Sequence, residues 1–308
     1  MTRLLFSILS LPLLVAAPAA AQFDLKGVVD LHIHCNPDSA PPRRIDAFEV
    51  ARLFKKEGMR AFVIKSHYMP TAQLAYSVNK CVPGVTAYGG ITLNRSVGGI
   101  NPEAVEHFAM VTGNFARIVW MPTMDSENVV RNSHANHPFV PVSKDGKLLP
   151  EVIEVMKVIK KHNLTLATGH STAQEDLMLI REARNLGIDR IIVTHAMPAP
   201  IHMTIAQMKE AAGMGASIEF VYNLIYPDPE QEKKNPGRKR LTFADYVRAI
   251  HAIGAEHCFL SIDVGQPMRP VHTEAWKEYM AGLRKAGITA QEFDIMAKRN
   301  PARLIGLE

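Results

Sequence analysis

The chain has 308 residues, 47% of them hydrophobic and 21% charged, and its formal net charge is +5. This composition suits a large globular domain with a full apolar core and excludes a disordered chain or a coiled coil. The positive charge is spread along the sequence, apart from one cluster at Lys233, Lys234, Arg238, Lys239 and Arg240. Nucleic-acid binders usually carry a denser basic stripe interleaved with aromatic residues. We therefore expect no nucleic-acid binding, and the cluster is either a solvated loop or a guide for an anionic substrate.

Residues 1–21 have the layout of a secretory signal peptide. Arg3 precedes an apolar stretch from Leu4 to Ala17, and the small residues Ala19-Ala20-Ala21 fit a cleavage site. The apolar stretch is shorter than the roughly 20 residues that span a bilayer. We therefore expect cleavage after Ala21 and no stable membrane anchor. The mature chain, residues 22–308, is then secreted or periplasmic, with a Gram-negative periplasm favoured.

Apolar runs alternate with segments of helical periodicity along the rest of the chain. Strands are expected at 28–34, 61–67, 85–93, 116–121, 164–170, 190–196, 216–222 and 258–263. Helices are expected at 45–58, 71–82, 101–113, 149–163, 173–187, 204–215, 243–255 and 273–287, with a further helix within 290–306. Eight continuous apolar strands, each followed by a helix, predict one α/β domain with the architecture of a (β/α)₈ TIM barrel. An open doubly wound sheet would usually show a glycine-rich phosphate turn, which the sequence lacks.

Polar side chains recur at the carboxyl ends of the predicted strands, where such barrels carry their active sites. They are His32, His34, Lys65, His67, His170, His195 and Asp263. In the stretch DLHIH (30–34), alternation along a strand points both histidines to one face, with Leu31 and Ile33 facing the helices. Imidazoles and a carboxylate suit zinc or a similar divalent transition metal. The pattern predicts a metal centre in the mouth of the barrel.

Three cysteines, Cys35, Cys81 and Cys258, are too few for a disulfide framework. One bridge is compatible with an exported protein, and the sequence does not select a pair. Cys35 follows His34 directly, but strand alternation turns its side chain to the opposite face. We expect Cys35 to be a passive neighbour of the metal centre.

These residues, in this order, resemble the amidohydrolase superfamily of metal-dependent hydrolases, which are TIM barrels. The resemblance is carried by DLHIH (30–34), GH (169–170), TH (194–195), SID (261–263) and the tail RNPARLIGL (299–307), and it covers essentially the whole mature chain. It implies that His32, His34 and Asp263 bind one metal ion. It also implies that His170 and His195 bind a second, or that His170 ligates while His195 acts on the substrate. Asp263 is implied to be the general base that takes a proton from metal-activated water.

The chain departs from the superfamily pattern at one position. Two-metal relatives often carry a carboxylated lysine at the end of strand four, whereas strand four here ends in Trp120-Met121-Pro122-Thr123. Lys65 closes strand two instead. It is either a carboxylated lysine that bridges two metal ions or a free ammonium that binds an anionic substrate or pairs with a carboxylate. The centre therefore holds one or two ions, and the sequence leaves the number open.

Three further residues are candidates for contact with the substrate. His67 lies on the same face as Lys65 if the strand persists, Arg95 follows the third strand, and Tyr222 ends the seventh. An arginine in that place suits a carboxylate, although a solvent-facing loop arginine is equally compatible. The long connection 125–147 is either a lid or a surface elaboration.

The most direct reading is a metal-dependent hydrolase that attacks an amide, lactone or ester bond of a small molecule. The first alternative is a lyase, either a decarboxylase or a hydratase, in which Lys65 and Arg95 bind a carboxylated substrate. The second is an exported metal- or ligand-binding protein without catalysis. The sequence does not name the substrate, and it leaves open whether the chain forms a homo-oligomer.

Overall fold

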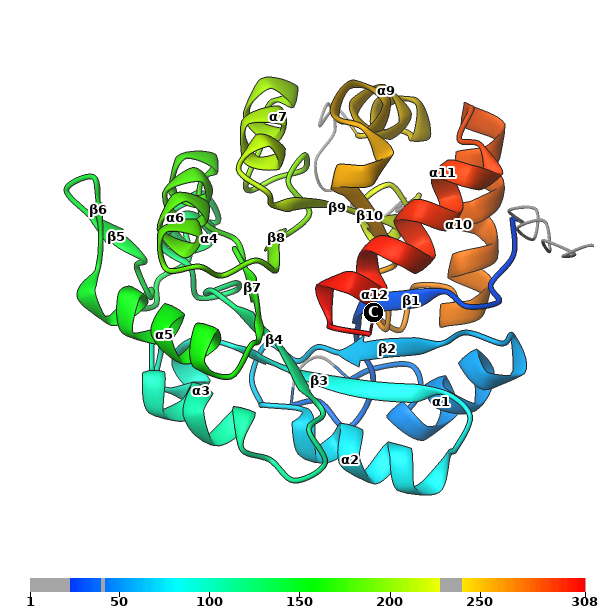
Figure 1. Cartoon of the computed structure of the whole chain (residues 1–308), viewed down its shortest axis with the longest axis horizontal. Coiled ribbons are helices and arrows are strands. Elements are labelled where there is room, and N and C mark those ends of the chain that lie inside the picture. Colours follow the sequence, from blue (N-terminus) through cyan, green and yellow to red (C-terminus); the bar gives the residue numbers. More distant parts are fainter. Residues whose placement is uncertain (1–22, 40–41, 228–239, 308) are drawn as a thin grey trace, which may run out of the picture.

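Eight parallel strands form a single sheet in the order β1-β2-β3-β4-β7-β8-β9-β10, with helices around the outside (Figure 1). The structure, a computed structural model, describes residues 23–39, 42–227 and 240–307. The strands are β1 (Val29–Ile33), β2 (Ala61–Ile64), β3 (Thr86–Thr92), β4 (Ala116–Trp120), β7 (Thr165–Ala167), β8 (Ile191–Val193), β9 (Ser217–Val221) and β10 (Cys258–Ser261). The predicted (β/α)₈ barrel is confirmed. The predicted signal peptide and the lysines and arginine at 233–239 lie outside the described residues.

The helices on the outside of the barrel follow the predicted order. They are α1 (Ala47–Lys56), α2 (Ala72–Cys81), α3 (Pro102–Ala109), α5 (Pro150–Lys161), α6 (Ala173–Asn185), α7 (Ile205–Gly213), α9 (Phe243–Ile253) and α10 (His272–Ala286). The C-terminal helical segment consists of α11 (Ala290–Asp294), η4 (Ile295–Arg299) and α12 (Asn300–Leu304). Asn101 caps α3 as predicted, by accepting a hydrogen bond from the Ala104 N–H. The helix ends at Ala109, however, and not near Gly113. Among the described residues, no helix is long and apolar enough to cross a bilayer.

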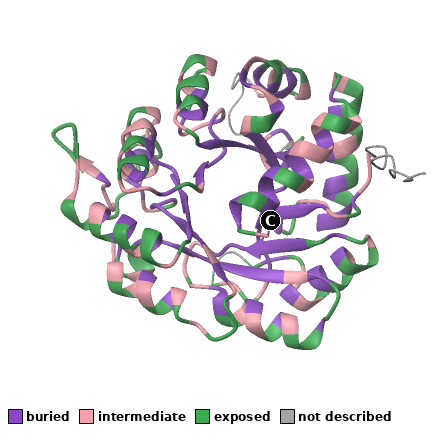
Figure 2. Ribbon diagram, in the orientation of Figure 1, coloured by how far each residue is buried: buried purple, intermediate pink, exposed green. Residues whose placement is uncertain are grey.

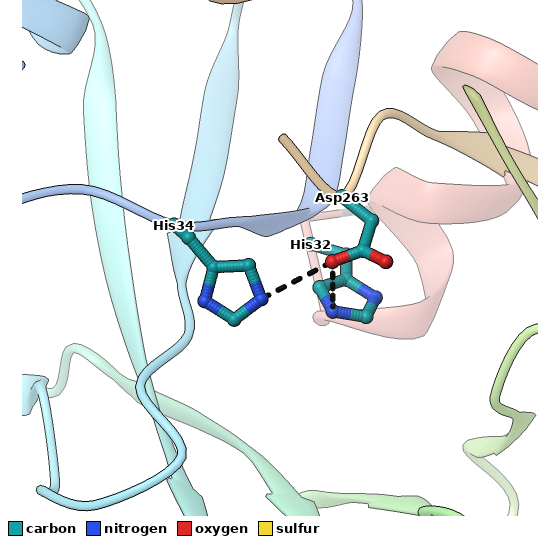
Figure 3. Close-up of side chains that lie close together, drawn as sticks. All are labelled: His32, His34 and Asp263. Atoms are coloured by element: carbon teal, nitrogen blue, oxygen red, sulfur yellow. Dashed lines mark ion pairs between the residues drawn. The ribbon is translucent and has the colours of Figure 1, made fainter. Parts of the chain in front are cut away.

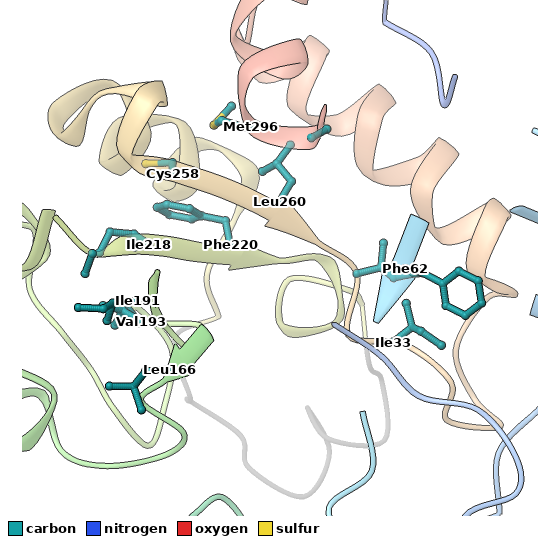
Figure 4. Packing of buried hydrophobic residues seen from close by; sticks show 14 of the residues in the cluster. Ile33, Phe62, Leu166, Ile191, Val193, Ile218, Phe220, Cys258, Leu260 and Met296 are labelled. Atoms are coloured by element: carbon teal, nitrogen blue, oxygen red, sulfur yellow. The ribbon is translucent and has the colours of Figure 1, made fainter. Parts of the chain in front are cut away.

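Apolar side chains fill two layers of the molecule. The larger layer lies between the strands and the surrounding helices, and Figure 4 shows part of it. A smaller cluster lies inside the ring of strands, where Ala302, Leu304 and Ile305 of the C-terminal segment pack against strand residues such as Leu31 and Phe259. The strands are accordingly buried on both faces, whereas the outward faces of the helices are exposed (Figure 2).

A bulge in β1 changes which of its residues face inward. Asp30 pairs with Phe62 and Ile33 pairs with Ile64, so three steps along β1 match two along β2. Leu31 therefore belongs to the cluster inside the barrel, and the prediction that it faces the helices is wrong. Ile33 packs in the outer layer, as predicted.

The ring of strands is completed where the chain beyond β10 meets β1. The backbone N–H of Asp263 donates to the carbonyl of His32 at 2.8 Å, and the N–H of His34 donates to the carbonyl of Val264 at 2.8 Å. These two hydrogen bonds hold Asp263 beside the histidine pair, although the residues come from opposite ends of the chain.

All three cysteines are free thiols. Cys35 and Cys258 are buried and Cys81 is exposed. Cys35 packs in the outer apolar layer, on the side of the strand that alternation predicted for it.

Candidate metal centre

His32, His34 and Asp263 converge on one point at the carboxyl ends of β1 and β10 (Figure 3). Asp263 Oδ1 lies 3.1 Å from His32 Nε2 and 3.1 Å from His34 Nε2. Zinc bonds of about 2.0–2.1 Å in a tetrahedral arrangement place neighbouring ligand atoms about 3.3 Å apart. The three side chains are buried, and their potential ligand atoms lie within 4.8 Å of one another. Their spacing therefore fits a single divalent ion.

His170 and His195 form a second pair of nitrogens beside the first group. Their Nε2 atoms are 3.1 Å apart, again close to the edge of a tetrahedron around a metal ion. The His195 ring stacks with the His32 ring at a centroid distance of 6.1 Å. The structure thus brings together five of the six residues that the sequence predicted as ligands, namely His32, His34, His170, His195 and Asp263.

The backbone around His170 is held by close packing. A Cβ at Gly169, whose φ is +70°, would lie 2.3 Å from the Met121 carbonyl oxygen, so only glycine fits before this histidine. Ser126 Oγ and Asn128 Nδ2 both donate to the His170 carbonyl at 3.1 Å. They come from the connection 125–147, which contains α4 (Glu127–Asn132) and the hairpin β5 (Ser143–Lys144) and β6 (Lys147–Leu148). This connection therefore holds the backbone of His170 in place. Its helix α4 was not predicted from the sequence.

Two of the candidate ligands have strained backbones. His195 has a φ of +24° and Asp263 a φ of +54°, a region that residues with a side chain rarely occupy. Such conformations persist only where surrounding contacts hold them, and they cluster at functional sites.

Glu219 is a component of the site that the sequence analysis missed. It lies on β9, is buried, and its Oε1 is 3.0 Å from His32 Nδ1. Its Oε2 accepts a hydrogen bond from the His195 N–H at 3.0 Å. The signal was present in the sequence, because a carboxylate at the centre of the apolar run ASIEFVY is rarely buried without a partner.

Lys65 is buried at the end of β2 and contacts the first group directly. Its Nζ lies 2.9 Å from His32 Nε2 and 5.1 Å from the centre of the Trp120 ring. Trp120 occupies the end of β4, where two-metal relatives carry a lysine. Its ring fits there because the facing position is Gly90, at which a Cβ would lie 2.1 Å from Trp120 Cζ3.

Burial and neighbouring charges shift the titration of these groups. Burial lowers the pKa of His34 and of His195 to about 4, so both are neutral at pH 7. Burial also opposes a charge on His32, but the carboxylates of Asp263 and Glu219 outweigh it and raise the pKa of His32 to about 9. Burial lowers the pKa of Lys65 to about 8. The desolvation of Asp263 is outweighed by the two adjacent histidines, which hold its pKa well below the usual value.

His67 lies against both halves of the centre. Its ring stacks on the His34 ring at a centroid distance of 5.0 Å and lies 6.3 Å from the His170 ring. Its Nδ1 is 2.8 Å from Thr123 Oγ1. β2 ends at Ile64, so His67 reaches the centre from the following loop rather than from a longer strand.

The other two predicted substrate contacts lie elsewhere. Arg95 is exposed on η1 (Arg95–Val97), and its side chain makes no hydrogen bond or ion pair with the described residues of the centre. Tyr222, in η2 (Tyr222–Leu224), donates a hydrogen bond to Glu278 and packs against Tyr279 of α10. It lines a separate cavity of about 650 Å³ together with Tyr226, Phe243 and other residues.

Comparison with solved structures shows which proteins share this fold. The organophosphorus hydrolase from Deinococcus radiodurans aligns over 94% of each chain, with a TM-score of 0.56 and 17% identity. A mutant of a PTE-like lactonase from the same organism aligns over 94% of this chain and 98% of that chain, with a TM-score of 0.57 and 16% identity. An amidohydrolase from Pseudomonas aeruginosa aligns over 91% of this chain and 95% of that chain, with a TM-score of 0.59 and 13% identity.

The fold is a TIM barrel shared with these three proteins, with a candidate metal centre at the carboxyl ends of its strands, and the predicted resemblance is confirmed for the fold. The chain belongs to the family of unknown function DUF6282, whose model matches residues 27–219. That match includes every predicted ligand except Asp263. No curated protein matches the sequence.

Proposed function

We propose that the protein is a metal-dependent hydrolase that uses water to cleave an ester, lactone or amide bond of a small molecule. The observation that carries this proposal is the convergence of His32 Nε2, His34 Nε2 and Asp263 Oδ1 at 3.1 Å, the spacing of metal ligands. A divalent ion held there would lower the pKa of water towards neutrality and polarise the oxygen of the bond under attack.

The donor set fits zinc or a similar divalent ion. His32 donates its Nδ1–H to Glu219, which turns the Nε2 lone pair towards the centre. At the centre, His32 Nε2 lies 3.1 Å from Asp263 Oδ1. A nitrogen lone pair and a carboxylate oxygen repel each other at 3.1 Å unless a proton or a metal ion lies between them. In the metal-free protein a proton on His32 meets this need, and a metal ion would replace that proton. The low pKa of His34 keeps its imidazole neutral, the form in which a histidine binds a metal ion.

Two residues of the chain would move or hold protons during the reaction. Asp263 stays ionised, so it can accept the proton of the attacking water and return it to the leaving group. Its second oxygen, Oδ2, is 3.4 Å from Asn223 Nδ2, which favours one orientation of the carboxylate. His195 either binds a second ion with His170 or acts on the substrate.

The structural neighbours guide the choice of substrates. They are described as an organophosphorus hydrolase, a lactonase and an amidohydrolase. Phosphotriesters, lactones and amides are therefore the classes to test first. The lyase alternative relied on Lys65 and Arg95 acting together, and Arg95 is exposed with no described contact to the centre. Hydrolysis is the better supported reaction.

The test combines metal analysis with turnover. Protein purified without chelators should contain a divalent metal and hydrolyse members of a panel of aryl esters, lactones, amides and phosphotriesters. Asp263→Asn should keep the fold and lose at least about 10²-fold in kcat/KM, the lower range for general base catalysis. Glu106→Gln, a surface substitution that breaks the ion pair with Lys161, is the matched control and should leave turnover unchanged. Reconstitution of the metal-free protein with metal, in the presence and absence of bicarbonate, tests whether Lys65 is carboxylated or is a free ammonium.

Two results would contradict the proposal. One is full turnover in Asp263→Asn. The other is a metal-loaded protein that hydrolyses nothing in the panel, which would favour a non-catalytic binding protein.

A further inference from the structure

We propose that His67 is a catalytic residue of this centre, a neutral imidazole that donates its Nε2–H to the substrate oxygen that gains negative charge during attack. This inference rests on the proposed hydrolytic function and adds a residue and a role to it. A chain of three hydrogen-bonded residues, Asn94, Thr123 and His67, carries the argument, because it fixes which nitrogen of His67 bears the proton.

The first residue of the chain, Asn94, can adopt only one amide orientation. Its Oδ1 accepts from the backbone N–H groups of Thr123 at 2.8 Å and of Asp125 at 3.2 Å. Its Nδ2 donates to the backbone carbonyl of His67 at 2.9 Å and to Thr123 Oγ1 at 2.9 Å. In a flipped amide, the NH₂ group would face the backbone N–H groups of Thr123 and Asp125, and the amide oxygen would face the carbonyl of His67. The direction of the hydrogen bond from Asn94 to Thr123 is therefore set by the backbone.

The second residue, Thr123, donates the next hydrogen bond of the chain, to His67. Thr123 is fully buried, and its Oγ1 already accepts from Asn94. Among the described residues, the acceptor within reach of its hydroxyl proton is His67 Nδ1, at 2.8 Å. A buried hydroxyl proton without an acceptor is unfavourable, so Thr123 donates to Nδ1. A neutral imidazole that accepts at Nδ1 carries its proton on Nε2.

The third residue presents this proton to the centre. His67 is half-buried, and its ring lies 5.0 Å from the ring of His34 and 6.3 Å from the ring of His170. Nδ1 faces Thr123, so Nε2–H lies on the other side of the ring. A donor fixed in advance stabilises a developing oxyanion without reorganising. His67 transfers no proton in this role.

His67 is excluded as a metal ligand because both of its ring nitrogens are already engaged. A nitrogen that bears a proton has no lone pair for a metal ion, and the lone pair on Nδ1 is occupied by Thr123. The metal content of the protein should therefore not depend on His67, which separates its role from that of His32 or His34.

The kinetic test compares two amide replacements. In His67→Gln the side-chain N–H can reach the position of Nε2, whereas in His67→Asn the amide extends only to the position of Nδ1. We expect His67→Asn to lose about 10²–10³-fold in kcat, the cost of one oxyanion donor, with little change in KM. His67→Gln should retain more of kcat, and both variants should bind as much zinc as the wild type.

A second measurement reads the tautomer without turnover. In zinc-loaded protein labelled with ¹⁵N-histidine, NMR should show an unprotonated Nδ1 and a protonated Nε2 for His67, assigned by its absence in His67→Gln. Thr123→Val, which removes the hydroxyl, should give a mixture of tautomers and a lower kcat. Thr123→Ser, which keeps the hydroxyl, should restore both.

The outcomes distinguish this inference from the proposed function. A proton on Nδ1 of His67, a loss of zinc in His67→Asn, or full kcat in that variant would each overturn the role of His67 while leaving hydrolysis by the wild type intact. A wild type that binds zinc but hydrolyses nothing overturns the proposed function and with it the catalytic role, whatever the tautomer.

Discussion

Glu219 Oε1 lies 3.0 Å from His32 Nδ1, and Glu219 Oε2 accepts a hydrogen bond from the backbone N–H of His195 at 3.0 Å. One side chain of β9 thus orients a ligand of the first group and holds the strained backbone of the second. Its desolvation is outweighed mainly by His32, which lowers the pKa of Glu219 and keeps it ionised. Carboxylates behind a ligating histidine fix its tautomer and raise its basicity.

Glu219→Gln should therefore weaken metal binding by roughly 10–100-fold. The amide can still accept from His32, but its NH₂ group then faces the N–H of His195, and one of these contacts is lost. Zinc affinity measured by competition with a chelator checks this. Glu210→Gln is the matched control, since Glu210 is a half-exposed residue of α7. Equal affinity of Glu219→Gln and the wild type would show that Glu219 is not needed to orient His32.

Gly90→Ala should destabilise the protein through the contact with Trp120. The new Cβ would lie 2.1 Å from Trp120 Cζ3, so the ring has to move inside a packed barrel. We expect a loss of about 1–3 kcal/mol in the free energy of unfolding, typical of an overpacked core, measured by urea denaturation. Gly213→Ala is the control, because a Cβ there meets no atom within 4 Å. A tolerated Gly90→Ala would mean that Trp120 is loosely held.

His34 and His195 should each make the metal-free protein less stable as the pH falls from about 6.5 to about 4. The pKa of His34 and of His195 is about 4 in the folded state against an ordinary 6.5. In this window the unfolded chain binds protons at these two residues that the folded chain rejects, so their contribution to the free energy of unfolding rises with pH. Denaturant titrations of metal-free protein at several pH values check the slope. His34→Gln should make it shallower, and an unchanged slope would contradict the assignment.

Asp176 should contribute the opposite trend, starting at its ordinary pKa of 3.8. It is buried on α6, and neither carboxylate oxygen has a hydrogen-bond partner among the described residues. Burial raises its pKa well above 3.8, and the nearby Thr168 side chain offsets only part of this effect. The folded state therefore keeps a proton that the unfolded chain releases, and the contribution of Asp176 to stability falls as the pH rises above 3.8. Asp176→Asn should remove this decline, whereas Asp189→Asn, at an exposed carboxylate, should not.

The fold could be predicted because its signals are local. Apolar runs such as AFVIKSH and the caps of helices such as Asn101-Pro102 are set by neighbouring residues. The candidate ligands were chosen from the barrel geometry, since the carboxyl ends of parallel strands meet at one face. His32, His170 and Asp263 were selected in this way, and the structure places them at that face.

The parts that were missed depend on contacts between distant segments. The inward turn of Leu31 comes from a bulge that exists only in the pairing of β1 with β2. The role of Glu219 depends on the residues after the neighbouring strand β8 and on β1, which is separated from β9 by β10 in the closed ring. The tautomer of His67 depends on Asn94 and Thr123, which follow two other strands. None of these three features leaves a recognisable pattern in the sequence of the segment that carries it.

The closure of the barrel also sets the order in which the centre can be assembled. During synthesis the two histidines of DLHIH emerge early, whereas the carboxylate that completes their trio is made near the end of translation. Until Asp263 and Val264 pair with the first strand, the nascent chain offers a metal ion only an incomplete set of donors. If the centre holds a metal ion as proposed, the ion would be loaded only once the chain is complete.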